Sequence, residues 1–422
     1  MDVTIKPCRL HGIADAPASK SEAHRRMICA GLSRQETVLT GFMTSQDMAA
    51  TARCLTALGA EMTLNGDELM LKGFARKSAA LPVFDCGESG STLRFFVPIA
   101  LALTGGGVFR MHGRLGQRPM DVYRDLFIPR GVIWRMGEGA DGAAELTVIG
   151  SISSGDYVMP GNVSSQFVSG LLFALPLLQG NSTLTVLPPV ESAGYINMTV
   201  KAIRESGVRL EEQSPFQWRI PGLQRYHAVG GRLHGDWSQA AVLLCAGALG
   251  QDVTVRGASR ETVQGDAAVI AHLEALGGVL HESADGLRMT RDTPRAAVID
   301  CRDCPDIAPI LALVCQMTPG ESRLTGCGRL RLKECDRLAA TVDLLNDLGG
   351  DAREDGDDIV LRGVSRLRGG KVRNYNDHRM VMLASIAALV SEQPVTVNGV
   401  EAINKSWPDY LRVYQALGGM TE

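Results

Sequence analysis

Four short segments of the chain combine cationic, acidic, hydroxyl-bearing and glycine residues without helical periodicity. They are residues 19–25 (SKSEAHR), 85–94 (DCGESGSTLR), 332–337 (LKECDR) and 376–380 (NDHRM). Arginine and lysine side chains bind phosphate and carboxylate groups, and glycine lets a ligand approach the backbone closely. These residue types therefore indicate binding of anionic groups.

Each segment also has an ordinary structural explanation. Residues 85–94 lead into an apolar helix whose free amides favour an anion, but the nucleotide P-loop pattern is absent. Lys20 and Arg25 lie at an expected helix start, where they could reach one phosphate or form a solvated basic end. The charges of residues 332–337 could pair locally on a surface, and His378 could simply cap a helix.

Composition bounds the class of protein. The 422 residues are 45% hydrophobic, which is enough apolar material for two or three globular domains. The net charge of −3 provides no general attraction to nucleic acid or to an anionic membrane. No apolar run approaches the ~20 residues that span a bilayer, and the first residues lack a signal-peptide pattern. We therefore expect a cytoplasmic protein without nucleic-acid or membrane partners.

The ten cysteines are scattered, and Cys301 with Cys304 forms one CxxC motif. A structural zinc site needs four ligands, and no second cysteine or histidine pair completes one here. We interpret the cysteines as buried reduced thiols and expect no metal site.

An internal repeat organises the chain. Six times, an amphipathic helical stretch leads to a glycine and then to a short apolar strand, at spacings of 69–76 residues. Glycine tolerates the left-handed conformation that ends helices, so each glycine predicts a helix end. The six glycines are Gly59, Gly131, Gly207, Gly277, Gly349 and Gly418.

Each repeat also predicts a strand and a helix start upstream of its glycine. The expected strands are residues 37–40, 108–111, 184–187, 253–255, 323–325 and 395–397. The expected helix starts are Asp47, Asp121, Asn197, Asp266, Asp336 and Asp409, because Asp and Asn side chains cap free amides. Six such units predict an α/β protein of two globes with three units each. The chain should cross between them at hinges near residues 16–20 and 229–236.

Ten motifs stand in the order found in one enzyme family. They are SKSEAHR, ESGSTLR, GQRPM, SSQF, ESAGY, GDWSQAA, CPDIA, KECDR, NDHRM and NKSWPDY. From about residue 17 to residue 412 the chain thus resembles the 5-enolpyruvylshikimate-3-phosphate synthases, which are enolpyruvyl transferases. The resemblance implies a two-domain inside-out α/β barrel, the enolpyruvyl transferase fold, in which each domain is built from three repeated βαβ-containing units.

The resemblance also implies which part of the chain forms each domain. Residues 1–18 and 235–422 would form one discontinuous domain, mainly on the phosphoenolpyruvate and catalytic side. Residues 19–234 would form the second domain, mainly on the shikimate 3-phosphate side.

The implied reaction transfers the enolpyruvyl group of phosphoenolpyruvate to the 5-hydroxyl of shikimate 3-phosphate. Phosphate leaves by addition and elimination through a tetrahedral intermediate. The resemblance places this step in the shikimate pathway of aromatic amino-acid biosynthesis and makes the enzyme a glyphosate target. It implies a monomer that needs neither a metal nor an organic cofactor.

The resemblance carries over residue by residue where the motifs match. It implies that Asp306 is the base for the 5-hydroxyl and that Glu334, assisted by Lys20, donates a proton to the methylene carbon. The implied shikimate 3-phosphate ligands are Ser21, Arg25, Ser164, Ser165, Gln166, Ser192, Tyr195, Asp306 and Lys333. The implied phosphoenolpyruvate ligands are Lys20, Gly90, Arg94, Arg118, Gln166, Arg337, Arg379 and Lys405.

Three departures from the family pattern concern binding detail. The usual Asn-Ala-Gly-Thr loop reads Glu88-Ser89-Gly90-Ser91, so a carboxylate replaces an amide near the expected anion site. Arg329 stands where asparagine is usual, and Ala193 where lysine often follows the serine of ESAGY. One phosphate contact is therefore absent or supplied by another residue.

Two rival functions share this architecture. The UDP-N-acetylglucosamine enolpyruvyl transferases carry a proton-donating cysteine in a loop that here reads GRLGQRPMD, with glycine in place of that cysteine. A non-catalytic anion-binding protein would be expected to have lost Asp306, Glu334 or several cations, and all of these are present. Both rivals are therefore less favoured than the shikimate enzyme.

Overall fold

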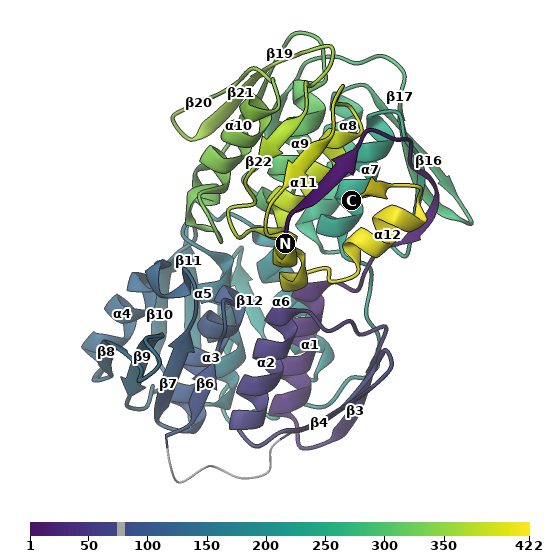
Figure 1. Ribbon diagram of the computed structural model, residues 1–422. Coiled ribbons are helices and arrows are strands. Elements are labelled where there is room, and N and C mark those ends of the chain that lie inside the picture. The colour runs from purple at the N-terminus through teal and green to yellow at the C-terminus, as the bar shows by residue number, and fades with distance from the viewer. Residues whose placement is uncertain (74–80) are drawn as a thin grey trace. The chain divides into compact units, whose positions relative to one another are not determined.

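The computed structural model describes residues 1–73 and 81–422, and these form a mixed α/β structure (Figure 1). The described chain divides into two compact units. One consists of Met1–Pro17 with His234–Glu422, called here the terminal unit, and the other of Ala18–Leu233, called the middle unit.

The same four-stranded sheet occurs three times in the described part of each unit. In every copy the first two strands are parallel, and the remaining pairings are antiparallel. In strand order, the middle-unit sheets are β14 (Gly231–Arg232), β3 (Glu36–Thr40), β5 (Glu68–Lys72), β4 (Glu61–Asn65); β6 (Val83–Asp85), β7 (Gly106–Met111), β9 (Ala144–Ile149), β8 (Ile133–Glu138); and β10 (Asp156–Pro160), β11 (Ser182–Leu187), β13 (Gln217–Ile220), β12 (Glu211–Ser214).

The terminal-unit sheets repeat this order, although the first and last strands of the chain share one of them. They are β2 (His11–Asp15), β15 (Asp252–Arg256), β17 (Gly286–Arg291), β16 (Gly278–Ser283); β18 (Val298–Asp300), β19 (Glu321–Thr325), β21 (Asp358–Arg362), β20 (Ala352–Asp355); and β22 (Gly370–Val372), β23 (Val395–Val397), β1 (Val3–Lys6), β24 (Met420–Thr421).

The helices of the middle unit are α1 (Lys20–Leu32), α2 (Gln46–Ala57), α3 (Gly90–Leu103), α4 (Asp121–Phe127), α5 (Ser165–Ala174) and α6 (Ala193–Glu205). Those of the terminal unit are α7 (Trp237–Ala248), α8 (Val269–Ala275), α9 (Ala308–Gln316), α10 (Arg337–Asp347), α11 (His378–Ala388) and α12 (Tyr410–Ala416). Short 3₁₀ helices are η1 (Leu115–Gln117), η2 (Ile128–Arg130), η3 (Leu175–Leu177), η4 (Gly265–Ala268), η5 (Pro305–Ile307), η6 (Gly328–Leu332) and η7 (Val400–Lys405).

The six glycines predicted as helix ends adopt positive φ angles between 77° and 99°, which confirms that prediction. The strand after each glycine was expected to be apolar, and this expectation was wrong. These strands (β4, β8, β12, β16, β20 and β24) are the edge strands of their sheets, and most of their residues are exposed. An edge strand has neighbours on one side only, so it needs fewer apolar side chains.

The six strands predicted upstream of the helices are confirmed as β3, β7, β11, β15, β19 and β23. The helix starts were predicted less well. Asp336 caps α10 by accepting from the Ala339 amide at 3.1 Å, whereas Asp47 lies one residue inside α2, which Ser45 caps. Asn197 lies within α6 on an exposed face and caps nothing. Several polar residue types suit the N-cap position equally well, so only the backbone geometry shows which residue caps the helix.

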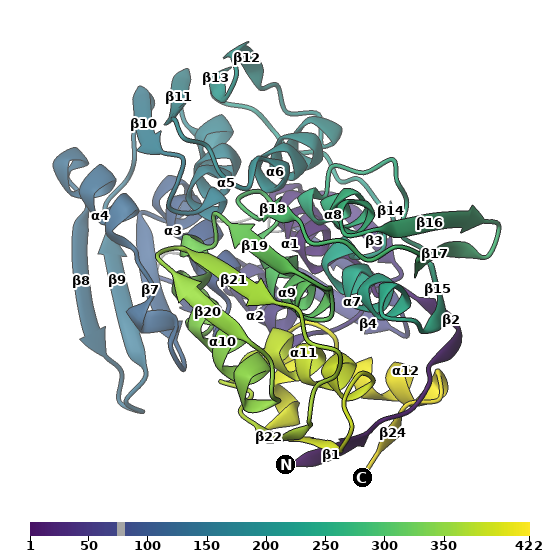
Figure 2. The same ribbon diagram turned by 90° about the horizontal axis from the view of Figure 1, so that it is seen from above.

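Several helices are buried on all their faces. Every residue of α7, α9 and α11 is buried, and these three helices pack against one another within the terminal unit (Figure 2). A helix buried all round must be apolar all round. Polar side chains are therefore confined to the ends of these helices, and their N-terminal ends carry the groups described next. In the described residues, none of the helices is both long and apolar enough to span a bilayer.

Candidate active site

A buried arginine connects three acidic side chains in the terminal unit. Arg337, the first residue of α10, is 2% exposed. Its Nε donates to Asp377 Oδ2 at 2.7 Å, its Nη1 to Asp306 Oδ1 at 2.9 Å, and its Nη2 to Glu334 Oε2 at 2.6 Å. The fork geometry of guanidinium allows these bonds to diverge in one plane. Two predicted catalytic residues, Asp306 and Glu334, are thereby held by the same side chain.

Asp306 is surrounded by positive charge. Lys333 Nζ donates to Asp306 Oδ1 at 2.9 Å, and Arg379 Nη2 lies 4.0 Å from Oδ2. Burial would raise the pKa of Asp306, but Lys333, Arg337 and Arg379 together hold that pKa well below its ordinary value. In the same cluster, burial and the charge of Arg337 lower the pKa of Lys333, although Asp306 opposes this. Asp306 is therefore ionised and able to accept a proton.

Two residues that sequence reasoning did not select position this cluster. Asp377 is fully buried, and its Oδ1 accepts from the Arg379 amide at 2.8 Å as the N-cap of α11. Ser238 lies near the start of α7. Arg379 Nη1 donates to the Ser238 carbonyl oxygen at 2.7 Å, and Arg379 Nη2 donates to Ser238 Oγ at 2.6 Å. Asp377 is part of the NDHRM motif, and Ser238 is part of GDWSQAA. Each motif was recognised without these roles.

Lys405, at the end of η7, is buried and donates to the Asn376 carbonyl at 2.7 Å. This bond places the lysine beside the start of α11, where Arg379 and Asp377 also lie. Arg329 of η6 is close enough to Lys333 for its charge to lower the lysine pKa. The departure from asparagine at this position therefore adds positive charge to the cluster.

A second group of predicted residues lies in the middle unit around Arg25 on α1. The guanidinium is 3% exposed and donates to Thr199 Oγ1 (2.7 Å), Ser21 O (2.7 Å) and Tyr195 O (2.9 Å). It also lies 5.4 Å from the centroid of the Phe95 ring. Burial lowers the pKa of Arg25 to about 10. Arg25 thus ties the start of α1 to α6, and at neutral pH it remains charged.

The start of α1 carries two further titratable groups. Lys20 Nζ donates to Asp47 Oδ2 at 2.7 Å, and both side chains are less than a fifth exposed. His24 is buried, with Nδ1 2.7 Å from Thr51 Oγ1. Burial lowers the pKa of His24 well below its ordinary value, and the charges of Lys20 and Arg25 lower it further. This helix end is accordingly basic through Lys20 and Arg25, with a neutral imidazole between them.

Arg94 and Gln166 connect α3 to α5. Arg94 Nη1 donates to Gln166 Oε1 at 2.6 Å, and Gln166 Nε2 donates to Ser91 Oγ at 2.9 Å. Ser164 caps α5 by accepting from the Gln166 amide at 3.3 Å, and Ser165 is the buried first residue of that helix. These bonds bring predicted ligands of both substrates into one network in the middle unit.

Gly90 begins α3 and lies directly against Arg118. A Cβ placed on Gly90 would come within 2.7 Å of Arg118 Nη1 and 2.9 Å of Arg118 Cζ. Glu88, one of the departures from the family pattern, lies against the backbone of Gly113 in the same way. Gly90 therefore provides room for a guanidinium at a helix N-terminus.

Ser192 occupies the N-cap position of α6 with a left-handed φ of 55°, and Tyr195 lies in the first turn. Tyr195 offers its carbonyl to Arg25. Ala193, a further departure, is the first residue of this helix. The loop before α6 contains a cis peptide bond between Pro188 and Pro189.

The buried Nε donors of Arg118 and Arg379 have no hydrogen-bond acceptor among the described residues. Such donors cost free energy when they are buried without an acceptor. An anionic ligand bound at each guanidinium would supply an acceptor. Within residues 1–73 and 81–422, no three His, Cys, Asp or Glu side chains are placed to hold one metal ion.

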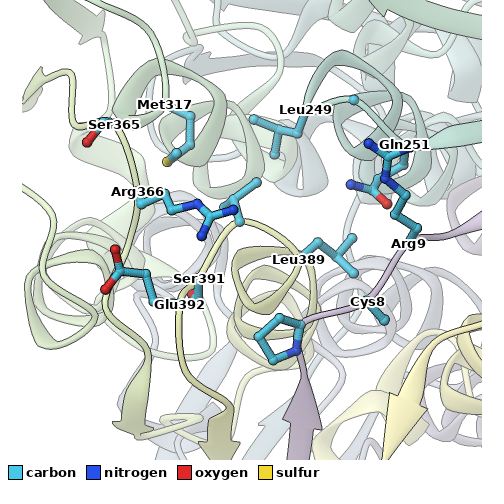
Figure 3. Close-up of a pocket in the computed structure, with 13 residues that line it drawn as sticks. Cys8, Arg9, Leu249, Gln251, Met317, Ser365, Arg366, Leu389, Ser391 and Glu392 are labelled. Carbon is cyan, nitrogen blue, oxygen red and sulfur yellow. The ribbon is translucent and has the colours of Figure 1, made fainter.

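A pocket of about 560 Å³ in the terminal unit lies away from this cluster. It is lined by Leu249, Met317 and Leu389, which directly follow the C-terminal ends of α7, α9 and α11. Figure 3 shows Arg366 extending into it. Because the three helices have 9–12 residues, their two ends are roughly 13–18 Å apart at 1.5 Å per residue. None of the predicted site residues lines the pocket.

The comparisons with known proteins decide the family. Residues 5–414 match the family described as EPSP synthase (3-phosphoshikimate 1-carboxyvinyltransferase). The chain belongs to the EPSP synthase family. A Clostridium perfringens protein named 3-phosphoshikimate 1-carboxyvinyltransferase is 37% identical over 420 residues, covering 99% of this chain and 98% of that protein. A protein of the same name from Clostridium acetobutylicum is 36% identical, covering 99% and 97%.

Solved structures share the fold of this EPSP synthase family member. An EPSP synthase from Acinetobacter baumannii matches with a TM-score of 0.80 at 21% identity, covering 100% of this chain and 99% of that one. The enolpyruvyl transferase NikO from Streptomyces tendae also matches with a TM-score of 0.80, at 18% identity and with 100% and 98% covered. The predicted family and the α/β fold are thereby confirmed. Neither rival function is favoured, because the family match and the names of the relatives both refer to the shikimate enzyme.

Proposed function

We propose that this chain transfers the enolpyruvyl group of phosphoenolpyruvate to the 5-hydroxyl of shikimate 3-phosphate and releases phosphate. One observation carries the proposal: Asp306 and Glu334 both accept hydrogen bonds from the buried guanidinium of Arg337. General acid–base catalysis of this addition needs one base and one acid held within reach of one substrate. The family match over residues 5–414 supports the same reaction.

Asp306 and Glu334 take complementary parts in the chemistry. Glu334, assisted by Lys20, protonates the methylene carbon of phosphoenolpyruvate, so that its C2 becomes electrophilic. The 5-hydroxyl oxygen attacks C2 while Asp306 accepts the hydroxyl proton. The Glu334 carboxylate then takes a proton back from the methyl group of the tetrahedral intermediate, the C2–O bond to phosphate breaks, and the double bond reforms. Cations stabilise the charge of the departing phosphate.

Substrate charge alters the basicity of Asp306. The charges of Lys333, Arg337 and Arg379 hold the pKa of Asp306 well below its ordinary value although burial opposes them, so the carboxylate is a weak base. Phosphate and carboxylate groups that bind Lys333 and Arg379 offset these positive charges. The Asp306 pKa then rises toward the range in which the group accepts a proton readily. Binding and base strength are therefore coupled.

The proposal assigns the substrate ligands as the motif matches imply. Shikimate 3-phosphate is held mainly by the middle unit, through Ser21, Arg25, Ser164, Ser165, Gln166, Ser192 and Tyr195, with Asp306 and Lys333 contributing. Phosphoenolpyruvate is held by Lys20, Gly90, Arg94, Arg118, Gln166, Arg337, Arg379 and Lys405. Within the described residues, the buried Nε donors of Arg118 and Arg379 have no hydrogen-bond acceptor. This supports anion binding at those two residues.

We further propose a two-domain inside-out α/β barrel. Residues 1–18 and 235–422 form one domain, mainly on the phosphoenolpyruvate and catalytic side, and residues 19–234 form the second, mainly on the shikimate 3-phosphate side. The fully buried helices α7, α9 and α11 support this arrangement, because helices form the core of an inside-out barrel. The enzyme acts as a cytoplasmic monomer and uses no metal or organic cofactor. Ten free cysteines support a reducing compartment.

The proposal is tested by phosphate release from phosphoenolpyruvate with two acceptors offered in parallel. Shikimate 3-phosphate should support turnover, while UDP-N-acetylglucosamine should support none above the acceptor-free rate. Turnover with UDP-N-acetylglucosamine alone would overturn the proposed acceptor. Absence of turnover with both, for a folded protein that still binds phosphoenolpyruvate or shikimate 3-phosphate by calorimetry, would indicate the non-catalytic anion-binding protein.

A further inference from the structure

Three thiols lie together next to the Asp306 cluster in the terminal unit. Cys301 and Cys304 close a turn in which the Cys304 amide donates to the Cys301 carbonyl at 3.2 Å. The thiols of Cys304 and Cys327 lie close enough to the Cys301 thiol to raise its pKa. The proposed reaction uses none of these sulfur atoms.

A histidine distinguishes Cys304 from its neighbours. His272 on α8 places Nε2 3.3 Å from Cys304 Sγ. The hydrogen bond from Cys301 lowers the pKa of Cys304 to about 6, and His272 contributes in the same direction, whereas burial opposes the shift. Hydrogen bonds with Cys304 and Cys327 raise the pKa of Cys301 well above its ordinary value. Cys304 is thus the thiolate and Cys301 the thiol of the pair, as in dithiols with one nucleophilic and one resolving cysteine.

The turn is suited to closing a disulfide. Residues at the two ends of such a turn have Cα atoms less than about 7 Å apart, and disulfides span Cα separations of about 4.4–6.8 Å. Cys304 is 1% exposed, but the turn residues Arg302 and Asp303 are exposed and His272 is half-buried. A small opening of this surface turn would admit a molecule little larger than water.

A metal site is the alternative use of three cysteines and a histidine. Among the described residues, however, no such side chains are arranged around a common point where one ion could bind. The His272 contact with Cys304, and the turn that joins Cys304 to Cys301, suit thiol exchange rather than tetrahedral coordination.

We propose that Cys304 and Cys301 form a peroxide-sensitive dithiol that oxidises to a disulfide and lowers the activity of the enzyme. The Cys304 thiolate attacks one oxygen of hydrogen peroxide, the O–O bond breaks, and the leaving hydroxide takes a proton to become water. The Cys301 sulfur then attacks the Cys304 sulfenic acid, the S–O bond breaks, and a second water leaves. Two thiols are oxidised and one peroxide is reduced to two waters.

The expected loss of activity rests on the proposed function, because it acts through Asp306. Asp306 follows Cys304 by two residues and lies in η5, whose first residue is Pro305. A disulfide across the turn changes the path of the backbone that presents the carboxylate to Lys333 and Arg337. Displacement of a catalytic group by about 1 Å can reduce turnover by about 10²-fold.

The disulfide is detected independently of activity by peptide mapping. The reduced protein is treated with hydrogen peroxide, free thiols are alkylated, and trypsin is added. Trypsin cleaves after Arg302, so a Cys301–Cys304 disulfide joins the peptides 296–302 and 303–323. The second peptide also contains Cys315, a buried cysteine of α9. Burial raises the pKa of Cys315 to about 12. The linked pair should form in wild type and in Cys315→Ser but not in Cys304→Ser.

Two further measurements guard against a folding defect in Cys304→Ser. In Cys301→Ser, Cys304 should remain as a sulfenic acid that dimedone labels. The initial rate of wild-type oxidation should rise with pH to half its maximum near pH 6, the value to which the Cys304 pKa is lowered, and then level off. An ordinary thiol reaches that point near pH 8.5. A midpoint near 8.5, or peroxide modification confined to the more exposed Cys8, would overturn the proposal.

The functional consequence has its own readout. Oxidised wild type should release phosphate at a rate at least about tenfold below the reduced protein, and dithiothreitol should restore the rate. Cys315→Ser should lose and regain activity as wild type does. Cys301→Ser cannot form the linked peptides, so it should not show the loss of activity that accompanies them. A linked pair with unchanged turnover would overturn the regulatory role. Reduced protein without any turnover would contradict the proposed function but leave the disulfide measurement valid.

Discussion

Arg337 and Asp377 form an ion pair whose partners are both withdrawn from water. Arg337 Nε lies 2.7 Å from Asp377 Oδ2, and the two side chains are 2% and 0% exposed. The pair joins the start of α10 to the start of α11, since Asp377 also accepts from the Arg379 amide. Arg337 can hold Asp306 and Glu334 because this third carboxylate fixes the plane of its guanidinium.

Asp377→Asn should destabilise the protein by about 3 kcal/mol. Asparagine caps helices as well as aspartate does, so the change removes the charge but keeps the cap of α11. The loss stays at the low end for a broken buried pair because Asp306 and Glu334 still compensate Arg337. Urea unfolding measures the change in free energy. The control Asp252→Asn breaks an exposed pair with Arg288 and should cost less than about 1 kcal/mol; equal losses would contradict the argument.

Asp306→Asn and Glu334→Gln should each reduce turnover by about 10²–10⁴-fold, because each removes a general acid–base group without changing its size. Phosphate release at saturating substrates measures the effect, and circular dichroism confirms folding. Asp347→Asn, an exposed change at the end of α10, is the matched control and should retain wild-type turnover. Wild-type rates in both active-site variants would exclude the two carboxylates from proton transfer.

His24 should make stability depend on pH. Its folded pKa is well below the ordinary value because of burial and of Lys20 and Arg25, so only the unfolded chain binds a proton just below pH 6.5. Stability is complete above about pH 6.5 and falls by about 1.4 kcal/mol per pH unit below it. His24→Asn keeps a partner for Thr51 but cannot titrate. The difference between wild type and this variant in urea unfolding should decrease by about 1 kcal/mol between pH 6.5 and 5.5.

A pH-independent difference between wild type and His24→Asn would show that the buried imidazole does not titrate between the folded and unfolded states.

Gly90→Ala should raise the KM for phosphoenolpyruvate by about tenfold, with a smaller effect on shikimate 3-phosphate. The new methyl group would come within 2.7 Å of Arg118 Nη1, and the flexible arginine side chain would move out of position. Inhibition by glyphosate, which we expect to compete with phosphoenolpyruvate, should weaken in parallel. Gly137→Ala, whose Cβ would have no described heavy atom within 4 Å, is the control. A larger increase in the KM for shikimate 3-phosphate than for phosphoenolpyruvate would show that Gly90 belongs to the shikimate 3-phosphate site.

Local features of the chain were predictable from sequence. The six repeat glycines were identified because a left-handed φ at a helix end is decided by one residue. The six central strands were found because alternation and β-branched residues mark half-buried strands. Asp306, Glu334 and Arg337 were selected because two short motifs, CPDIA and KECDR, carry them together.

Sequence reasoning did less well where the answer depended on neighbours. Ser45 rather than Asp47 caps α2, although both residue types suit the position. The strands after the repeat glycines proved to be exposed edges, because their place in the sheet, not their composition, decides what they pack against.

The amino-acid sequence by itself determined the repeat, the family and the residues available for acid–base chemistry. Only the tertiary structure decided that Asp377 and Ser238 hold the cluster, since Ser238 is 141 residues from Arg379, and that His272 lies against Cys304. The physical reason is that a buried charge must find its partners among whichever helix ends the fold brings beside it. Helix ends and turns depend on adjacent residues, whereas the compensation of buried charge depends on residues far apart in the chain.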